Sequence, residues 1–174
     1  MTLKGLSLPT VLAGLFLAAG TAQAQVVTKT ANMNVSINIK NSCTFGTIGN
    51  LNFGSHDFAI TSNVDVDASF ELNCTKNTPY TIALSSGLNG TTVADRKMKS
   101  TIANATETIP YQLYKTAARG AGDVWGDTGT DVVNVTAAAS AGGNKTYTVF
   151  GRVPPQTAGA AGNFADAVTI TVSY

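Results

Sequence analysis

The sequence predicts an all-β protein built as an antiparallel sandwich or barrel, and three observations support this prediction. Apolar and polar residues alternate with a period of two in several short stretches, as in strands that bury one face. Turn-forming residues separate these stretches, for example at 85–87, 89–90 and 142–144. No stretch sustains the period of an amphipathic helix, although 137–141 are expected to form a turn.

The clearest strand runs from Val66 to Cys74, where apolar positions alternate with Asp67, Ser69, Glu71 and Asn73. The same pattern, in shorter form, predicts further strands at 80–84, 111–113, 147–149 and 168–174. These segments lie far apart in the chain, so the sheets they form must be held together by long-range pairing.

Length and composition are those of one folded domain. The chain has 174 residues, of which 44% are hydrophobic and 12% charged, a balance that supplies a core and is unlike that of disordered chains. Without Lys4, the 11 basic residues become 10 and equal the 10 acidic ones. This neutrality argues against a nucleic-acid groove or a polybasic membrane anchor, so no nucleic-acid partner is expected.

The first 24 residues are typical of a secretory signal peptide. Lys4 supplies the positive charge, 6–19 the apolar stretch, and Ala22-Gln23-Ala24 the small-residue cleavage motif. Cleavage is predicted between Ala24 and Gln25. A transmembrane anchor is the alternative, but proline and glycine interrupt a run that is already short for a membrane span.

The chain contains two cysteines, Cys43 and Cys74. Export to an oxidising compartment favours a disulfide between them, which would stabilise the fold by roughly 3–4 kcal/mol. A redox or metal site would need a C-x-x-C spacing or neighbouring histidines, and the sequence has neither.

A long alternating segment precedes the first cysteine. Polar residues occupy the even positions from Thr28 to Lys40, and the odd positions end in five apolar residues, Ala31, Met33, Val35, Ile37 and Ile39. The run exceeds the usual ~5–6 residues of a strand. From these residues alone, two interpretations stay open: an ordinary first strand, or a strand on a free N-terminus that inserts into a neighbouring molecule.

No pattern of residues predicts catalysis, a metal or a cofactor. The sequence lacks the nucleophile-elbow, phosphate-loop and zinc-protease motifs, and its single histidine is His56. Asp123, Asp127 and Asp131 do not have the spacing of a calcium loop. Trp125 could stack on a sugar, but a tryptophan beside a turn is more often part of the core. The protein is therefore not expected to be an enzyme.

Several short motifs follow one another in an informative order. They are the alternating N-terminal segment running into Asn41-Ser42-Cys43-Thr44, then Gly49-Asn50-Leu51-Asn52-Phe53-Gly54, Leu72-Asn73-Cys74, Ile109-Pro110-Tyr111-Gln112-Leu113-Tyr114-Lys115, Trp125-Gly126-Asp127, Tyr147-Thr148-Val149-Phe150-Gly151-Arg152-Val153-Pro154 and Asn163-Phe164-Ala165-Asp166. Together they resemble the spore coat protein U domain family, which is shared with subunits of archaic, Csu-type chaperone–usher pili. The resemblance covers essentially the whole chain after the leader.

The resemblance implies an incomplete immunoglobulin-like sandwich that lacks its last strand and is completed by a donor strand. A periplasmic chaperone would fill the gap first. At an outer-membrane usher, the N-terminal segment of an identical or related subunit would replace it, head to tail. Residues 25–40 would be the donor segment and 41–174 the sandwich, with the five apolar odd positions as groove-filling knobs. The expected function is a structural pilus subunit that travels through the periplasm to the cell surface and supports adhesion and biofilm formation.

Two alternatives use the same sequence features. A small outer-membrane β-barrel fits the leader, the length and the alternating strands, but the strands are short and aromatic girdles are not apparent. A secreted coat or lectin-like sandwich protein would not polymerise, and an exposed Trp125 in a sugar-binding loop would distinguish it.

Overall fold

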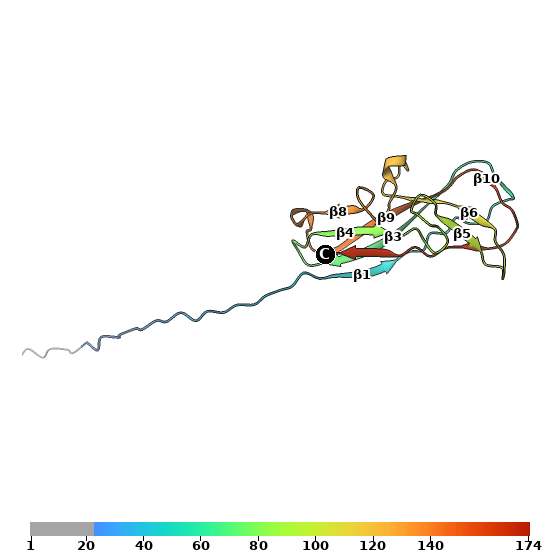
Figure 1. The fold of residues 1–174 in the computed structure, drawn as a ribbon. Coiled ribbons are helices and arrows are strands. Elements are labelled where there is room, and N and C mark those ends of the chain that lie inside the picture. Colours follow the sequence, from blue (N-terminus) through green and yellow to red (C-terminus); the bar gives the residue numbers. More distant parts are fainter. Residues whose placement is uncertain (1–22) are drawn as a thin grey trace, which may run out of the picture. The chain divides into compact units, whose positions relative to one another are not determined.

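A computed structural model describes residues 23–174, which fall into two units. The first unit, up to Ile37, is extended chain without helix or strand, and its side chains are exposed. The second, Asn38–Tyr174, contains every strand of the described chain (Figure 1). Most of the predicted signal peptide, residues 1–22, lies outside the described residues, and its cleavage site falls in the extended unit.

The larger sheet has four antiparallel strands in the order β1-β3-β9-β7. Its bounds are Cys43–Ile48 for β1, Val64–Cys74 for β3, Gly143–Val153 for β9 and Gln112–Tyr114 for β7. The central strands β3 and β9 pair along their full lengths, from Val64 opposite Val153 to Cys74 opposite Gly143. The strand predicted at 66–74 is thus confirmed as a central strand.

A three-stranded sheet in the order β12-β4-β8 faces it across the core. These strands are Ile170–Ser173 (β12), Tyr80–Leu84 (β4) and Val133–Val135 (β8). The strands predicted at 80–84 and near the end of the sequence are both found here. β12 is antiparallel to β4, with Ile170 opposite Leu84 and Ser173 opposite Thr81.

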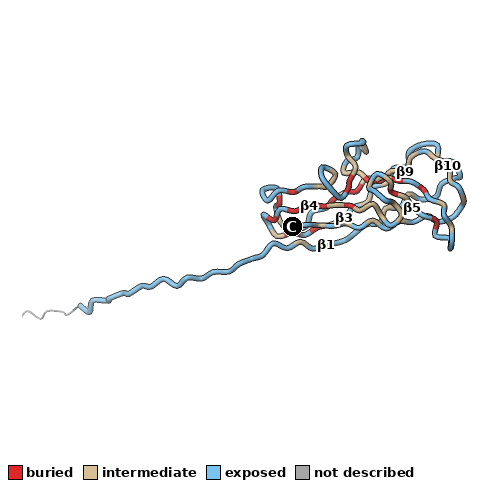
Figure 2. The backbone as a smooth tube through the Cα atoms, in the orientation of Figure 1, coloured by how far each residue is buried: buried red, intermediate tan, exposed pale blue. Residues whose placement is uncertain are grey.

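The two sheets share one hydrophobic core. Phe70 of β3 lies at its centre, with ring centroids 6.0 Å from Trp125 and 5.6 Å from Tyr147. Figure 2 shows the buried residues gathered along the interior strands and the exposed ones along the edges and loops. Trp125 is 1% exposed and its indole N–H donates a 3.0 Å hydrogen bond to the carbonyl of Ile82. The core interpretation of Trp125 is confirmed, and the exposed sugar-binding tryptophan of the lectin-like alternative is not found.

Smaller elements complete the domain. One small sheet has the order β11-β5-β6 and another pairs β10 with β2, with bounds Phe164–Ala165 (β11), Lys97–Ser100 (β5), Thr108–Pro110 (β6), Gln156–Thr157 (β10) and Ala59–Ile60 (β2). Two short 3₁₀ helices, Ala121–Asp123 and Ala137–Ala139, lie in connections, and the second coincides with the predicted turn. Within residues 23–174, no helix has the length and apolar character needed to cross a membrane.

In each of the two facing sheets, an outermost strand is hydrogen-bonded to a neighbour on one side and has no strand on the other side. β1 pairs with β3, and β12 pairs with β4, and among the described strands neither has a second neighbour. The all-β antiparallel fold is therefore confirmed, and each main sheet has an open edge. An ordinary first strand at 27–39, one of the two interpretations of the N-terminal alternation, is not found, because the first strand begins at Cys43.

Candidate functional site

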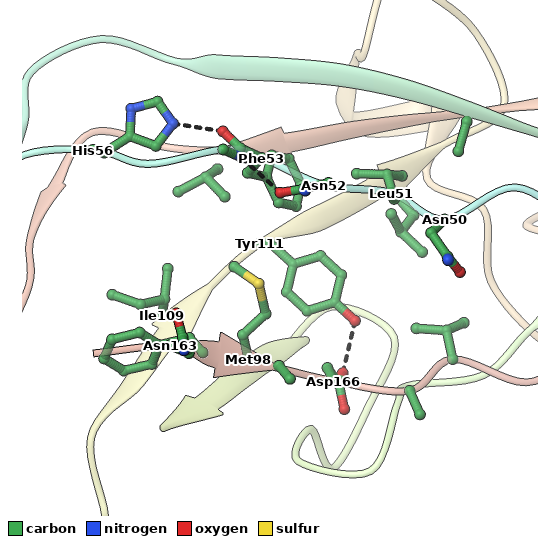
Figure 3. Close-up of a pocket in the computed structure, with 18 of the residues that line it drawn as sticks. Asn50, Leu51, Asn52, Phe53, His56, Met98, Ile109, Tyr111, Asn163 and Asp166 are labelled. Atoms are coloured by element: carbon green, nitrogen blue, oxygen red, sulfur yellow. Dashed lines mark hydrogen bonds between the residues drawn. The ribbon is translucent and has the colours of Figure 1, made fainter. Parts of the chain in front are cut away.

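An elongated groove lies within the domain and has a volume of about 970 Å³. Two chain segments form its walls, 48–58 after β1 and 158–170 before and into β12. Figure 3 shows the side chains that converge on it, including Leu51 and Phe53 from the first wall and Asp166 from the second. The floor is mostly apolar and comes from both sheets: Ala68, Phe70, Leu84, Met98, Ile109, Tyr111, Leu113, Val149 and Val153.

The two ends of the groove differ. At one end the walls are tied together, because β2 pairs with β10 and the amide of Ala158 donates a 2.9 Å hydrogen bond to the carbonyl of Phe58. At the other end the walls continue into β1 and β12, the strands with open edges. The groove is thus continuous with two unpaired strand edges.

The backbone of the first wall is available for pairing. Gly49 donates a 2.8 Å hydrogen bond to the carbonyl of Ser69, but residues 50–57 make no backbone–backbone hydrogen bond within the described chain. Their local contacts use side chains: Gly54 donates to the Asn52 side chain at 2.9 Å, and Nε2 of His56 lies 2.6 Å from the Phe53 carbonyl oxygen. An extended wall with unpaired N–H and C=O groups is a template for another strand.

Leu51 and Phe53 rest on a glycine of the central strand β9. A Cβ atom added to Gly151 would lie 2.7 Å from Cδ2 of Leu51, closer than such atoms approach, and 3.0 Å from Cζ of Phe53, a tight contact. The missing side chain at Gly151 therefore leaves room for the ends of these two side chains.

A polar contact anchors the second wall. The hydroxyl of Tyr111 donates a 2.7 Å hydrogen bond to Asp166 (Figure 3). The other carboxylate oxygen of Asp166 accepts from the Leu88 amide at 2.8 Å and from the Asn89 side chain at 2.9 Å. Burial, reinforced by Asp166, raises the pKa of Tyr111 well above its usual value, so the hydroxyl keeps its proton and remains the donor. Asp166 thus joins the second wall to the floor and to the 85–90 loop.

A buried arginine fixes the end of β4 next to the floor. Arg96 is 1% exposed, and its guanidinium donates to the carbonyl oxygens of Leu84, Ser85 and Trp125 at 2.7–2.9 Å and to the Gln112 side chain at 2.6 Å. Burial lowers the pKa of Arg96, but carbonyl dipoles take up its donors. This network holds both main sheets in place at mid-groove.

A disulfide fixes the start of the β1 edge. Cys43 and Cys74 are bonded, as the sequence led us to expect, and they face each other in the register of β1 and β3 with their Cα atoms 4.1 Å apart. Phe45 and Ile48, farther along β1, stay 42% and 52% exposed. The open edge of the larger sheet is therefore both covalently positioned and apolar.

The groove combines two features that suit an extended peptide. It offers apolar side chains together with unpaired backbone groups, and such surfaces can recognise extended peptides by ladder hydrogen bonds and alternate side-chain pockets. Within residues 23–174 no three metal-binding side chains come together, and His56 lies exposed on the first wall.

The expected donor residues lie in the extended segment before the domain. Met33, Val35, Ile37 and Ile39 are 70–89% exposed, and Ala31 is exposed as well. The groove in this structure is formed without them. The predicted knobs and the groove are thus two separate apolar surfaces of one chain.

The groove residues themselves were not predicted as a site from the sequence. Leu51, Phe53 and Asp166 lie in motifs that pointed to the family, and the spacing of Leu51 and Phe53 has the period of a strand. From that spacing, residues 49–54 could have been predicted to form a wall of the groove. Tyr111 was predicted to lie in a strand, but its partner Asp166 is 55 residues away.

Comparison with known families identifies the domain. The family model of the Spore Coat Protein U domain matches residues 29–171. The chain belongs to this family. Protein U of Myxococcus xanthus is 29% identical over 163 residues, a match that covers 87% of this chain and 88% of that protein.

A solved structure with the same type of fold is the CsuC–CsuE chaperone–tip adhesion subunit pre-assembly complex from archaic chaperone–usher Csu pili of Acinetobacter baumannii. The match has a TM-score of 0.50 and 20% identity, and it covers 78% of this chain and 40% of that one. This chain thus spans less than half of the solved chain. A chain from a chaperone–tip adhesin complex of CFA/I fimbriae has a TM-score of 0.41 and 12% identity, with 64% and 35% of the two chains covered. The first match shows a similar fold and supports the antiparallel all-β architecture described above.

Proposed function

We propose that this protein is a structural subunit of a surface pilus, assembled by donor-strand exchange along the chaperone–usher route. One observation carries the proposal: the same chain has an apolar groove between open strand edges and, ahead of that domain, an exposed segment of alternating apolar residues. A head-to-tail contact in which each segment fills the next groove does not close on itself and generates a filament.

The donor segment has apolar surface available for the contact. Met33, Val35, Ile37 and Ile39 are 70–89% exposed, so their burial in a neighbour's groove would be favourable. Hydrogen bonds to the wall at 50–57 would add to this gain.

The remaining assignments follow from this proposal. Residues 1–24 are a signal peptide cleaved between Ala24 and Gln25, 25–40 the donor segment and 41–174 the sandwich domain. A periplasmic chaperone occupies the groove before assembly, and an outer-membrane usher catalyses the exchange. The family resemblance and the chaperone complex of the solved Csu subunit support these partners. The fibre supports adhesion and biofilm formation, and the protein has no enzymatic role.

A charge at the centre of the donor segment tests the proposal. Met33→Asp would bury an unpaired carboxylate in the neighbour's groove and stop fibre growth. Asn34→Asp is the matched control, because it introduces the same charge one residue away on the opposite face of the segment. Surface material is sheared from cells, run on SDS gels with and without heating, and probed for this protein.

The wild type and Asn34→Asp should give an unheated ladder that collapses to one band on heating, and Met33→Asp should give monomer alone. Deleting 25–39 should also abolish the ladder. A wild-type protein that runs as monomer in both lanes, or a Met33→Asp ladder equal to that of the wild type, would contradict the proposal. The first outcome would favour a secreted coat protein that does not polymerise.

A further inference from the structure

The point where the donor segment enters its own domain is held by a relay of hydroxyl groups. The Ser42 amide donates a 3.1 Å hydrogen bond to Oγ1 of Thr75, which lies 2.6 Å from Oγ1 of Thr78. Oγ1 of Thr78 donates at 3.3 Å to the side-chain oxygen of Asn41. The Thr75 amide closes the loop with a 2.9 Å hydrogen bond to the Ser42 carbonyl.

The proton directions in this relay are mutually consistent. Thr75 accepts from Ser42 and donates to Thr78 at its shortest contact, and Thr78 then donates to Asn41. The Ser42 carbonyl is a second, more distant acceptor for the Thr75 hydroxyl, at 3.5 Å. Thr78 is 0% exposed, which makes loss of a partner costly there. Asn41 and Ser42 are exposed, so burial of their own side chains does not hold them in place. The relay and the adjacent disulfide are what fix these two residues.

We infer that Asn41, Ser42, Thr75 and Thr78, here called the root clamp, set the angle between successive subunits in the fibre. The inference rests on the proposed function. With the donor segment held in the neighbour's groove through Ile39 and the root clamp beginning at Asn41, Lys40 is the single residue left between two fixed points. One residue spans at most about 3.3–3.6 Å, which leaves neighbouring domains little freedom.

Without the link from Thr78 to Asn41, the fixed point moves to Ser42, whose carbonyl still accepts a 2.9 Å hydrogen bond from the Thr75 amide. The free linker then grows from one residue to two, 40–41, and the root-mean-square reach of a short flexible linker grows as the square root of its length, about 1.4-fold. The root-clamp residues are positioning residues: they touch neither the groove nor the donor knobs, but they orient the segment that carries those knobs.

Thr78→Val and Asn41→Ala test the inference from the buried and the exposed end of the relay. Two measurements apply to each variant: backbone order of residues 40–42 by NMR relaxation in the purified chain, and the distribution of angles between adjacent subunits in electron micrographs of fibres. Tyr80→Phe is the matched control, because it removes a buried hydroxyl whose 2.6 Å hydrogen bond goes to Tyr147 and not to the root. Insertion of Gly-Ser between Lys40 and Asn41 keeps the root clamp but lengthens the linker.

Both clamp variants should keep the disulfide and the heat-sensitive ladder, lose order at residue 41, and widen the angular distribution, since the reach of the free linker grows about 1.4-fold. The insertion leaves three free residues and should widen the distribution at least as much, and Tyr80→Phe should leave it unchanged. The inference is overturned if Asn41→Ala keeps the wild-type distribution while the insertion widens it, or if Tyr80→Phe widens it equally. Absence of wild-type fibres would instead remove the proposed function, and the NMR result would then show only whether the relay orders the root.

Discussion

Replacing Gly151 with alanine should displace side chains of the first wall of the groove, because that wall packs against Gly151. Gly151 pairs with Val66 of β3 on one side and with Leu113 of β7 on the other, so its backbone has little room to move. An alanine Cβ would lie 2.7 and 2.9 Å from the two methyl groups of Leu51 and 3.0 Å from the ring of Phe53. The end of the Leu51 side chain must therefore shift. Because this is the flexible end of a half-buried side chain, the cost should be about 1 kcal/mol, the lower end of the range for overpacking.

A double-mutant cycle separates this steric effect from a general loss of stability. Leu51→Ala alone should cost about 1–3 kcal/mol, because the side chain is half-buried against the core. In the double variant the smaller side chain makes room for the new methyl group, so the loss of unfolding free energy in the double variant should be smaller than the sum of the two single losses by about 0.5–1 kcal/mol. Urea unfolding followed by the fluorescence of Trp125 measures each free energy.

Gly122→Ala is the control for the cycle. A Cβ at Gly122 meets no atom within 4 Å and the residue is exposed, so its substitution should change the free energy of unfolding by less than about 0.5 kcal/mol. Strict additivity of Gly151→Ala and Leu51→Ala, or equal effects at positions 151 and 122, would refute the assignment of Gly151 as the support of the wall.

Three further predictions concern the disulfide and two ionisable contacts. Alanine at both cysteines should lower the free energy of unfolding by about 3–4 kcal/mol in urea titrations, since the bond spans 31 residues. Because the pKa of Tyr111 is raised in the fold, wild-type stability should fall as the pH rises above about 10, where the unfolded tyrosine ionises. Urea midpoints of Tyr111→Phe between about pH 9 and 11 should decline less steeply. The hydrogen bond from Arg152 lowers the pKa of Asp65, so its stabilisation is present at neutral pH and lost below about pH 4; Asp65→Asn should flatten that acid slope in thermal melts.

The sequence predicted the central strands of the fold better than the edge strand β1 and the two-residue strands. Period-two alternation identified 66–74 and 80–84, because these strands bury one face over many residues. It did not predict β1, whose residues after Cys43 are all exposed and so show no alternation of burial. The two-residue strands β2, β10 and β11 exist only through pairing with distant segments, for which no local signal is present.

Arg96 shows what local reasoning cannot supply. A charged residue in a Lys- and Asp-containing stretch is expected at the surface, yet it is buried because the carbonyl groups of 84, 85 and 125 converge on it from separate loops. The groove is likewise formed by segments that lie far apart in the sequence. Its walls are 48–58 and 158–170, and only the folded domain brings them together. The alternation of the apolar N-terminal residues is visible in the sequence itself, and their role as a donor strand stays a prediction.

Hydrogen exchange should reveal which backbone groups receive the donor strand. Amides of 50–57 have no backbone partner in the described chain and should exchange rapidly in the purified monomer, whereas the β3–β9 ladder should be protected. In fibres, protection should appear along 50–57 at alternate residues, because only every second amide of a strand faces a given neighbour. Met33→Asp protein mixed with wild-type fibres should stay unprotected. If the wall amides exchange equally fast in fibres and monomers, the donor strand does not pair with this wall, and the unpaired edge of β12 would be the strand that binds it.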